Sequence, residues 1–179
     1  MKFPKIANED LGRMDVAQYK AAPKTPLIIV LDNIRSHNNV GSCFRTADAF
    51  RAEAIYLCGY TDKPPHRDIH KTALGATESV NWQYFETTAA AVQALKEQGY
   101  FVWAIEQAEG RTMLNDLQLQ TSGKHAIIFG NEVNGVDDEV MALVDGVIEI
   151  PQFGTKHSLN ISVSAGIVIW EFWRQLIGR

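Results

Sequence analysis

Three segments of the chain, residues 39–47, 128–135 and 150–162, combine glycine, asparagine and serine with a few charged side chains. Small polar residues of this kind leave backbone amides accessible where a ligand must approach closely. Arg45 in the first segment could clamp a phosphate or ribose with its planar guanidinium. Glu132 in the second could bind a cation or a hydroxyl, or could anchor the loop by accepting backbone N–H bonds. Each segment taken alone is equally compatible with an ordinary turn or helix start.

Two glycines, Gly130 and Gly135, frame a G-x-x-x-x-G pattern that resembles the start of a phosphate-binding P-loop. A P-loop continues with Lys and then Ser or Thr, whereas Val136 and Asp137 follow here, so we reject a nucleoside triphosphatase. No apolar strand runs into G-x-G-x-x-G, which disfavours a dinucleotide-binding fold of the usual kind. The chemistry of the segment must therefore come from its asparagine and glutamate.

The 179 residues have the length and composition of one globular domain with a substantial core. No apolar stretch approaches the roughly 18 residues that a membrane span needs, and residues 1–7 lack the apolar region of a secretory signal. Cys43 and Cys58 are too few for a disulfide framework, so we expect two buried, reduced thiols. These features predict a cytoplasmic protein that does not associate with a membrane.

The formal net charge of −4 argues against a nucleic-acid-binding protein, because such domains are usually basic. The charges are, however, unevenly distributed. Residues 35–71 contain six Lys or Arg, four Asp or Glu and three His, whereas residues 106–149 contain two Lys or Arg and nine Asp or Glu. Such a chain can present one positive face. His66 and His70 have the H-x-x-x-H spacing, but without a suitable third ligand they predict no metal site.

Short apolar runs alternate with segments of helical periodicity along the chain. The all-apolar run at residues 27–31 is typical of a parallel strand buried on both faces. Gly99 is suited to end the helix expected at 87–98. We expect strands at 27–31, 54–58, 79–85, 100–105, 126–129 and 147–150, and helices at 9–20, 39–51, 67–75, 87–98, 137–144 and 160–177. The alternation predicts an α/β fold, a mostly parallel sheet with helices on both faces.

The three polar segments all lie where an expected strand passes into a helix. Parallel sheets bind ligands at the carboxyl ends of their strands, so these segments should meet at one edge of the sheet. The basic segment 63–71 adds Arg67 and Lys71, which could contact phosphates. The sequence therefore predicts one composite site assembled from distant parts of the chain.

In this order and spacing, the three segments resemble the signature motifs of the SpoU, or TrmH-type, family of RNA ribose 2′-O-methyltransferases. The resemblance covers the chain from about residue 25 to its end. It implies the SPOUT superfamily fold, an α/β sheet with a deep trefoil knot in its C-terminal part. Nothing in the periodicity indicates a knot, since chains generally do not thread loops. We expect a short helical extension at residues 1–24 and a methyltransferase catalytic domain at residues 25–179.

The resemblance also implies S-adenosylmethionine as the cofactor, held in the knot, and no metal. The residues expected to bind the cofactor are Ile105, Glu106, Gly130, Asn131, Ile150, Ser158 and Leu159. The residues expected to serve catalysis are Arg45, Asn39, Glu132, Ser158 and Asn160. The residues expected to contact RNA are Arg35, His37, Arg67 and Lys71. The family acts as a homodimer with each active site at the subunit interface, and the apolar helix 160–177 is a candidate for that contact.

The arginine that matches Arg45 has been viewed in the family as the base that takes the ribose 2′-hydroxyl proton. Arginine stays protonated in proteins, so we prefer that Arg45 clamps a phosphate and makes the hydroxyl more acidic electrostatically. Methyl transfer from a sulfonium needs mainly alignment of nucleophile, methyl group and leaving sulfur. No metal is required for this chemistry.

Two rival functions remain open. A noncatalytic RNA-binding dimer could keep the fold, although the presence of Arg45, Glu132, Ser158 and Asn160 speaks against it. A small-molecule methyltransferase would make no use of the basic segment 63–71. Larger members of the family carry separate RNA-binding domains, whereas compact members often modify transfer RNA. We therefore expect transfer RNA as the substrate.

Overall fold

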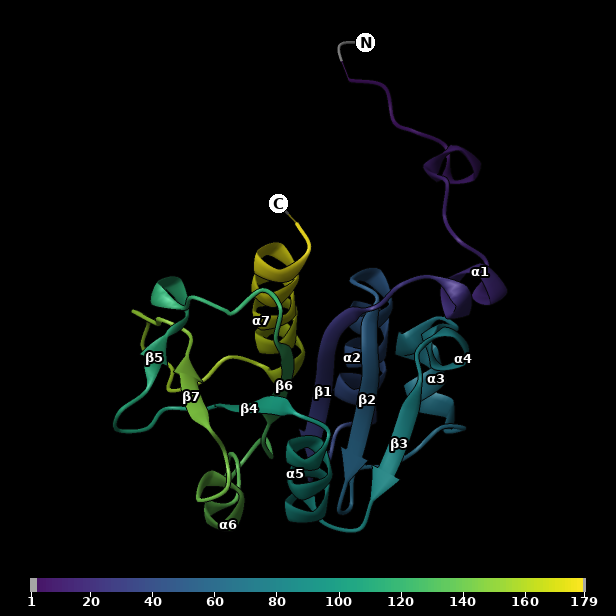
Figure 1. Cartoon of the computed structure of the whole chain (residues 1–179). Helices are drawn as coiled ribbons and strands as arrows, with labels where there is room; N and C mark the ends of the chain where they lie inside the picture. Colours follow the sequence, from purple (N-terminus) through teal and green to yellow (C-terminus); the bar gives the residue numbers. More distant parts are fainter. Residues whose placement is uncertain (1–2, 179) are drawn as a thin grey trace.

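A seven-stranded sheet with the strand order β3-β2-β1-β6-β4-β7-β5 forms the centre of the computed structural model (Figure 1), which describes residues 3–178. Neighbouring strands pair in parallel throughout this sheet. The strands are β1 (Thr25–Asp32), β2 (Ala52–Cys58), β3 (Trp82–Phe85), β4 (Tyr100–Ile105), β5 (Thr112–Met113), β6 (Lys124–Phe129) and β7 (Gly146–Glu149). The predicted parallel α/β sheet is thus confirmed.

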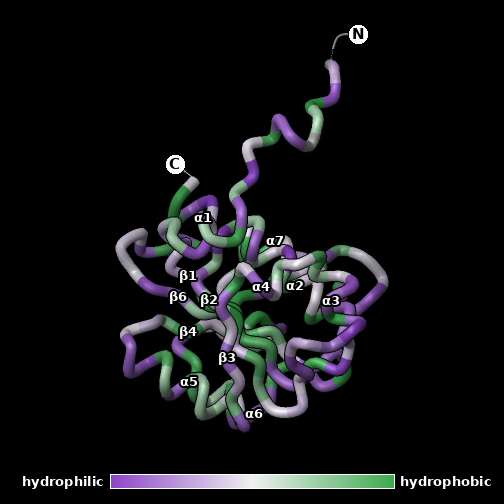
Figure 2. The backbone as a smooth tube through the Cα atoms, turned by 90° about the vertical axis from the view of Figure 1, so that its right-hand side faces the viewer, coloured by the Kyte–Doolittle hydropathy of each residue, from purple (hydrophilic) through white to green (hydrophobic). Residues whose placement is uncertain are grey.

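Helices of very different length connect the strands. They are α1 (Val16–Ala21), α2 (His37–Ala49), α3 (Arg67–Ala73), α4 (Ala76–Ser79), α5 (Thr88–Glu97), α6 (Asp138–Met141) and α7 (Ile161–Leu176), with 3-10 helices η1 (Asn8–Leu11) and η2 (Leu114–Asp116). Among the described residues, no helix is both long enough and apolar enough to cross a bilayer. Residues 3–15, which precede α1, extend away from the body of the molecule (Figures 1 and 2).

Strand β1 shows why this region of the sequence is continuously apolar. Its odd-numbered side chains, Leu27, Ile29 and Leu31, join a core with α2, α3 and α7, while Ile28 and Val30 join a second core with α5 and α6. All five are at most 2% exposed, and burying each such side chain contributes about 2 kcal/mol. The hydrophobic segments gather in the middle of the molecule in Figure 2. Helices therefore cover both faces of the sheet, as the apolar run predicts.

The pairing register brings four strand ends to the same level. Leu31 of β1 pairs with Phe129 of β6, Phe129 pairs with Ile105 of β4, and Ile105 pairs with Ile148 of β7. The polar segments after β1, β4, β6 and β7 consequently leave the sheet along one edge. This alignment is the physical basis for a single site built from distant sequence.

Several predicted boundaries are wrong, and the causes are local. The expected helix at 9–20 is broken because Gly12 adopts a left-handed φ of 60° and Asp15 starts α1 anew with a capping box to Gln18. The helix expected at 67–75 is α3, which ends at Ala73 because Leu74 and Gly75 adopt left-handed φ values of 50° and 90°; the separate turn α4 follows. Because α4 extends to Ser79, the strand expected at 79–85 begins only at Trp82.

Other predictions differ in extent. The helix expected at 137–144 is the single turn α6, and the short elements β5 and η2 have no counterpart in the prediction. Gly99, with φ 80°, follows α5 as expected. Cys43 and Cys58 are buried and unpaired, as predicted, and burial raises the pKa of each thiol to about 12. Residues 1, 2 and 179, which belong to the expected extension and domain, lie outside the described residues.

Candidate functional site

A cleft of about 530 Å³ opens at the edge where the four strands end. All seven residues expected to bind a cofactor line it, namely Ile105, Glu106, Gly130, Asn131, Ile150, Ser158 and Leu159. Phe129 and Ile148 complete an apolar floor between polar walls. A cleft with an apolar floor and a few convergent polar groups has the usual character of a small-molecule site.

The loop after β6 approaches itself so closely that Gly130 has no room for a side chain. A Cβ atom on Gly130 would lie 2.1 Å from the carbonyl carbon of Gly135 and 2.2 Å from the amide nitrogen of Val136. Gly135 has φ 72°, and its backbone lies against the carboxylate of Glu106. Glu106 in turn accepts a hydrogen bond from the amide of Val136 at 3.1 Å. These contacts hold the wall of the cleft in one conformation.

Asn131 fixes the same loop from inside. It is 6% exposed, and all the polar atoms of its side chain are engaged. Its amide nitrogen donates to the carbonyl of Asn33 at 2.7 Å and to the hydroxyl of Tyr60 at 2.6 Å. Its amide oxygen accepts from the amides of Val133 and Asn134 at 2.9 and 3.1 Å. Asn131 therefore acts on the shape of the loop, although it also lines the cleft.

Glu132 links the cleft to the first turn of α2. Its carboxylate accepts hydrogen bonds from the backbone amides of Arg35 at 3.0 Å and Ser36 at 3.1 Å, and from the side chain of Asn39 at 3.1 Å. Partial burial of Glu132 acts to raise its pKa, but these bonds and one from its own amide together lower that pKa below its usual value. The ionised carboxylate is thus a structural anchor at the start of α2.

Asn39 and Asn160 meet across the site. The side-chain nitrogen of Asn160 donates to the side-chain oxygen of Asn39 at 3.3 Å, and Asn39 itself is 8% exposed. Asn160 also caps α7, because its oxygen accepts from the amide of Ser162 at 2.9 Å. Asn160 therefore caps α7 and also belongs to the site. Glu132, Asn39 and Asn160 form a continuous network, which we call the Glu132 network, between the loop after β6, α2 and α7.

Arg45 lies on α2 but outside the cleft. It is exposed, and the lining formed by the described residues does not include it. Six residues separate it from Asn39, which corresponds to about 9 Å along the helix axis and a different side of the helix. Of the predicted catalytic residues, Glu132, Ser158 and Asn160 line the cleft and Asn39 contacts two of them. The single chain does not bring Arg45 to the same place.

The residues predicted to contact RNA lie around the start of α2 and on α3. Arg35, Arg67 and Lys71 are exposed. The imidazole of His37 contacts the carboxylate of Asp62 and stacks on His66, with 3.9 Å between ring centroids and 16° between planes. The sequence contains no signal for this stack, because the two histidines are brought together only by the fold.

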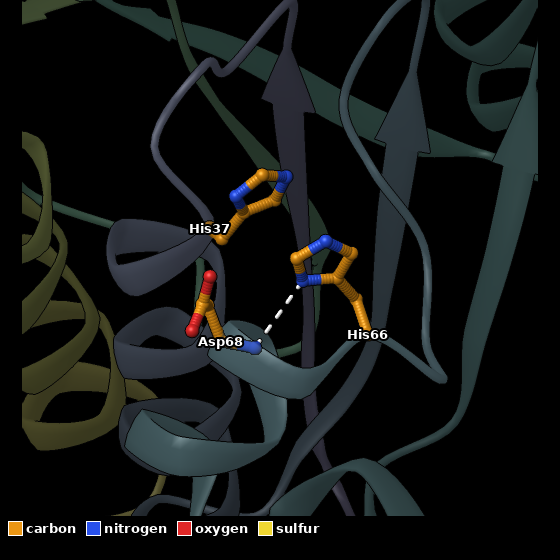
Figure 3. Close-up of side chains that lie close together, drawn as sticks. All are labelled: His37, His66 and Asp68. Carbon is orange, nitrogen blue, oxygen red and sulfur yellow. Dashed lines mark hydrogen bonds between the residues drawn. The ribbon is translucent and has the colours of Figure 1, made fainter.

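Within the part of the chain that the structure describes, His37, His66 and Asp68 form a group whose possible metal-ligand atoms lie within 4.8 Å of one another (Figure 3). This group contains His37, whereas the H-x-x-x-H spacing in the sequence pairs His66 with His70. The in-plane lone pairs of two nearly parallel, stacked imidazoles do not converge on one point, as tetrahedral coordination requires. Nδ1 of His66 also accepts a hydrogen bond from the amide of Asp68 at 3.2 Å. This arrangement is that of a stacked aromatic pair.

Further residues of the site carried no recognisable signal in the sequence. Gln107, Gln152 and His157 line the cleft, and the side chain of Gln107 donates to the carbonyl of His157 at 2.7 Å. Tyr60 supports Asn131 from a loop that was expected only as a connection. These contacts bridge segments about 50 residues or more apart, and only the folded chain defines them.

A ligand cleft at the carboxyl edge of a parallel sheet, walled by tight glycine loops and bordered by a polar network, defines a cofactor-binding α/β enzyme. The sequence model of the SpoU rRNA Methylase family matches residues 26–170, and the chain belongs to this family. The resemblance seen in the three polar segments is thereby confirmed.

Relatives and solved structures agree with this assignment. The chain is 33% identical over 171 residues to a 23S rRNA (guanosine-2′-O-)-methyltransferase RlmB of Vibrio parahaemolyticus, covering 96% of this chain and 68% of that protein. It superposes with a TM-score of 0.80 and 26% identity on an AdoMet-bound rRNA methyltransferase from Sinorhizobium meliloti, covering 87% of this chain and 58% of that one.

A third similarity involves a protein of nearly the same length. A solved structure whose description refers to the 2-OH methylation of C/U34 on tRNA is 28% identical to this chain, with a TM-score of 0.75. The match covers 86% of this chain and 97% of that chain. The curated relatives are longer, and this chain spans about two thirds of their length.

Proposed function

We propose that the chain is an S-adenosylmethionine-dependent methyltransferase that methylates a ribose 2′-hydroxyl in RNA. The observation that carries the proposal is that two of the three signature segments line one cleft and that the Glu132 network joins the first segment to them. The matched relatives are named as ribose 2′-O-methyltransferases, and one solved neighbour is described as AdoMet-bound.

The chemistry of the cleft fits S-adenosylmethionine. Ile105, Ile150 and Leu159 offer an apolar surface to an adenine ring, while the carboxylate of Glu106 favours a positively charged sulfonium or ammonium group. The absent side chain at Gly130 lets backbone come close to a ligand. When bound, this cofactor supplies a methyl group that its positive sulfur has already activated.

The roles of the chain's own residues follow from their positions. Asn39 and Asn160 are held by the Glu132 network and are placed to orient a ribose at the mouth of the cleft. Ser158, on the same loop as Asn160, offers a hydroxyl at that mouth. Arg45 then supplies a fixed positive charge that clamps a phosphate and stabilises the developing alkoxide. The remaining contribution is alignment of the reacting groups.

The position of Arg45 suits a homodimer in which it serves the partner's cleft. Val163, Ile167 and Trp170 form an outward stripe on α7, with 50%, 38% and 48% of their surfaces exposed. Such a stripe on a single face is typical of a helix that packs against another protein surface. Helix α7 packs beside α2 (Figure 1). A second copy covering α7 would bring its own cleft toward the outward face of α2.

Further expectations belong to the same proposal. We place the methyltransferase domain at residues 25–179 with a short extension at 1–24, and we expect the C-terminal part to form the trefoil knot of the superfamily. Strand β7 lies between β4 and β5 in the sheet, so the C-terminal strands are not arranged in the order of the sequence. This crossing of the chain supports the expected knot. An RNA substrate and reduced cysteines favour the cytoplasm.

Two RNA classes compete as the substrate. Relatives such as the Vibrio enzyme are named for 23S rRNA. The compact protein described by tRNA methylation, however, is matched along 97% of its length. We retain transfer RNA as the proposed substrate on the strength of this nearly full-length match.

A transfer assay tests the proposal. The purified protein is incubated with methyl-tritiated S-adenosylmethionine and either bulk tRNA from cells that lack the protein or transcribed fragments of 23S rRNA. The RNA is then digested to nucleosides. We expect label in a 2′-O-methylated nucleoside from tRNA; label in a base, or in neither RNA, would refute the proposed reaction, and label only from rRNA would correct the substrate.

A further inference from the structure

A second hollow of about 260 Å³ lies between α3, α4 and the start of β3, separate from the cofactor cleft. Flat side chains dominate its lining, which includes Pro64, Pro65, His66, Ile69, His70 and Trp82. The indole of Trp82 is 37% exposed although it is one of the largest apolar groups of the chain. With about half the volume of the cofactor cleft, the hollow suits one planar heterocycle.

The flat lining has a specific chemical meaning in a protein that acts on RNA. Single-stranded RNA is recognised by splaying out a base and stacking it on aromatic side chains, including histidine and tryptophan. Glu78 and His70 at the wall offer acceptor and donor groups for the edge of such a base. The occupant that fits both the flat faces and the polar edge is a nucleobase.

Positive side chains adjoin, in sequence, the residues that line the hollow. Lys63 precedes the two prolines, and Arg67 and Lys71 follow His66 one helical turn apart on α3; all three are exposed. Asp62 is already paired with His37. These cations complement the phosphates on either side of a bound base, whereas a neutral aromatic metabolite would leave them unused.

A chain of contacts connects this hollow to the cofactor cleft. His66 lines the hollow and stacks on His37, the first residue of α2. The amides of Arg35 and Ser36, just before His37, bind the Glu132 carboxylate in the wall of the cleft. The two hollows are therefore neighbours across the start of α2.

We infer that the hollow around Trp82 is a binding subsite for an unstacked nucleobase of the RNA that is methylated in the cofactor cleft. This inference rests on the proposed function. It assigns Trp82 and His66 as positioning residues for the RNA strand, away from the reacting atoms. Base stacking, which depends little on salt, then contributes binding free energy that the net negative charge of the chain does not provide.

Steady-state kinetics of Trp82→Ala test the inference. Bulk tRNA from cells that lack the protein, or a 23S rRNA fragment if only that accepts methyl groups from the wild-type protein, serves as the probe. We expect the KM for RNA to rise about tenfold, as for loss of one stacked base, with the KM for S-adenosylmethionine and the melting temperature unchanged. Trp82→Phe, which keeps an aromatic face, should restore most of the loss.

Phe101→Ala is the matched control, since Phe101 is an equally exposed aromatic residue, at 40%, on β4. It should leave the KM for RNA unchanged. A Trp82→Ala protein with the wild-type KM for RNA would overturn the inference, while the wild-type transfer reaction would still stand. Should Trp82→Ala not fold, ultraviolet cross-linking of the same RNA to the wild-type protein decides: an RNA-linked peptide containing His66 or Trp82 supports the subsite, and cross-links confined to other peptides refute it.

Discussion

The side-chain nitrogen of Asn39 donates a hydrogen bond to the Glu132 carboxylate at 3.1 Å, across 93 residues of sequence. The same carboxylate receives the backbone amides that precede α2, so the helix carrying Arg45 is anchored to the wall of the cleft. A change in that wall is thereby transmitted to the helix. The proposed catalytic arginine and the proposed cofactor site are mechanically joined even though Arg45 itself lies outside the cleft.

Energetic coupling between Asn39 and Glu132 is the first prediction. Asn39→Ala should lower the free energy of unfolding by about 1 kcal/mol, because it removes a charge-assisted hydrogen bond, and Glu132→Ala should lower it further, because the amides of Arg35 and Ser36 lose their acceptor as well. The double variant should lose clearly less than the two single losses added together. Urea unfolding of the four proteins measures this. Strict additivity would show that the Asn39–Glu132 bond contributes nothing.

Gly130 provides the second prediction. Gly130→Ala should weaken binding of S-adenosylhomocysteine at least about tenfold, because the new methyl group collides with backbone atoms of Gly135 and Val136 and must displace the loop. Gly154→Ala is the control, since a Cβ there meets nothing within 4 Å. Isothermal titration of both variants measures the affinities. Equal affinities would mean that the 130–135 loop does not form the cofactor site.

Arg45 carries the third prediction. Arg45→Ala should abolish methyl transfer and leave the affinity for S-adenosylhomocysteine nearly unchanged, because the side chain lies outside the cleft of its own chain. The exposed Arg13, far along the sequence, gives the control variant Arg13→Ala, which should remain active. Tritium transfer to RNA measures the activity.

Mixing variants tests whether Arg45 acts in the partner's site. Arg45→Ala and Gly130→Ala subunits, unfolded and refolded together, should recover about a quarter of wild-type activity if two-fold dimers carry shared sites. Each mixed dimer then contains one site with an intact cleft and an intact arginine. Activity that stays at the level of the separate variants would place Arg45 and the cleft in the same subunit.

His125 gives a prediction about pH. Burial lowers its pKa below the usual value, and the bond to the carbonyl of Gln120 opposes this only in part. A group whose folded-state pKa is depressed contributes stability above its unfolded pKa of about 6.5 and loses it as the pH falls further. Wild-type stability should therefore decline between pH 7 and pH 5, and His125→Gln should decline less steeply. Urea midpoints across this range measure both slopes; parallel slopes would exclude His125 as the cause.

Local patterns predicted the parts of the fold that depend on local physics. The apolar run in β1 implied two covered faces, and strand-to-helix junctions implied a common edge. The end of α3 at Leu74 was not predictable in this way, because a left-handed leucine has no characteristic sequence pattern. By contrast, the Asp15–Gln18 capping box was a readable signal for the start of α1.

The features of the site also divide into those that local patterns predict and those that they do not. The seven cofactor residues expected from the family resemblance do line the cleft, because backbone and apolar contacts follow the strand ends. The hydrogen-bond partners of Glu132 were not predictable, because Arg35 and Ser36 lie 96 residues or more away in the sequence. The His37–His66 stack likewise arises from packing of α2 against α3, which no local spacing encodes.

Mapping of ribose methylation in total RNA tests the central claim most directly. RNA is compared between cells that contain the protein, cells that lack it, and cells that carry Arg45→Ala in its place. We predict that a 2′-O-methylated nucleotide is present in the first, lost in the second, and not restored in the third. Identical ribose methylation in all three would contradict the account.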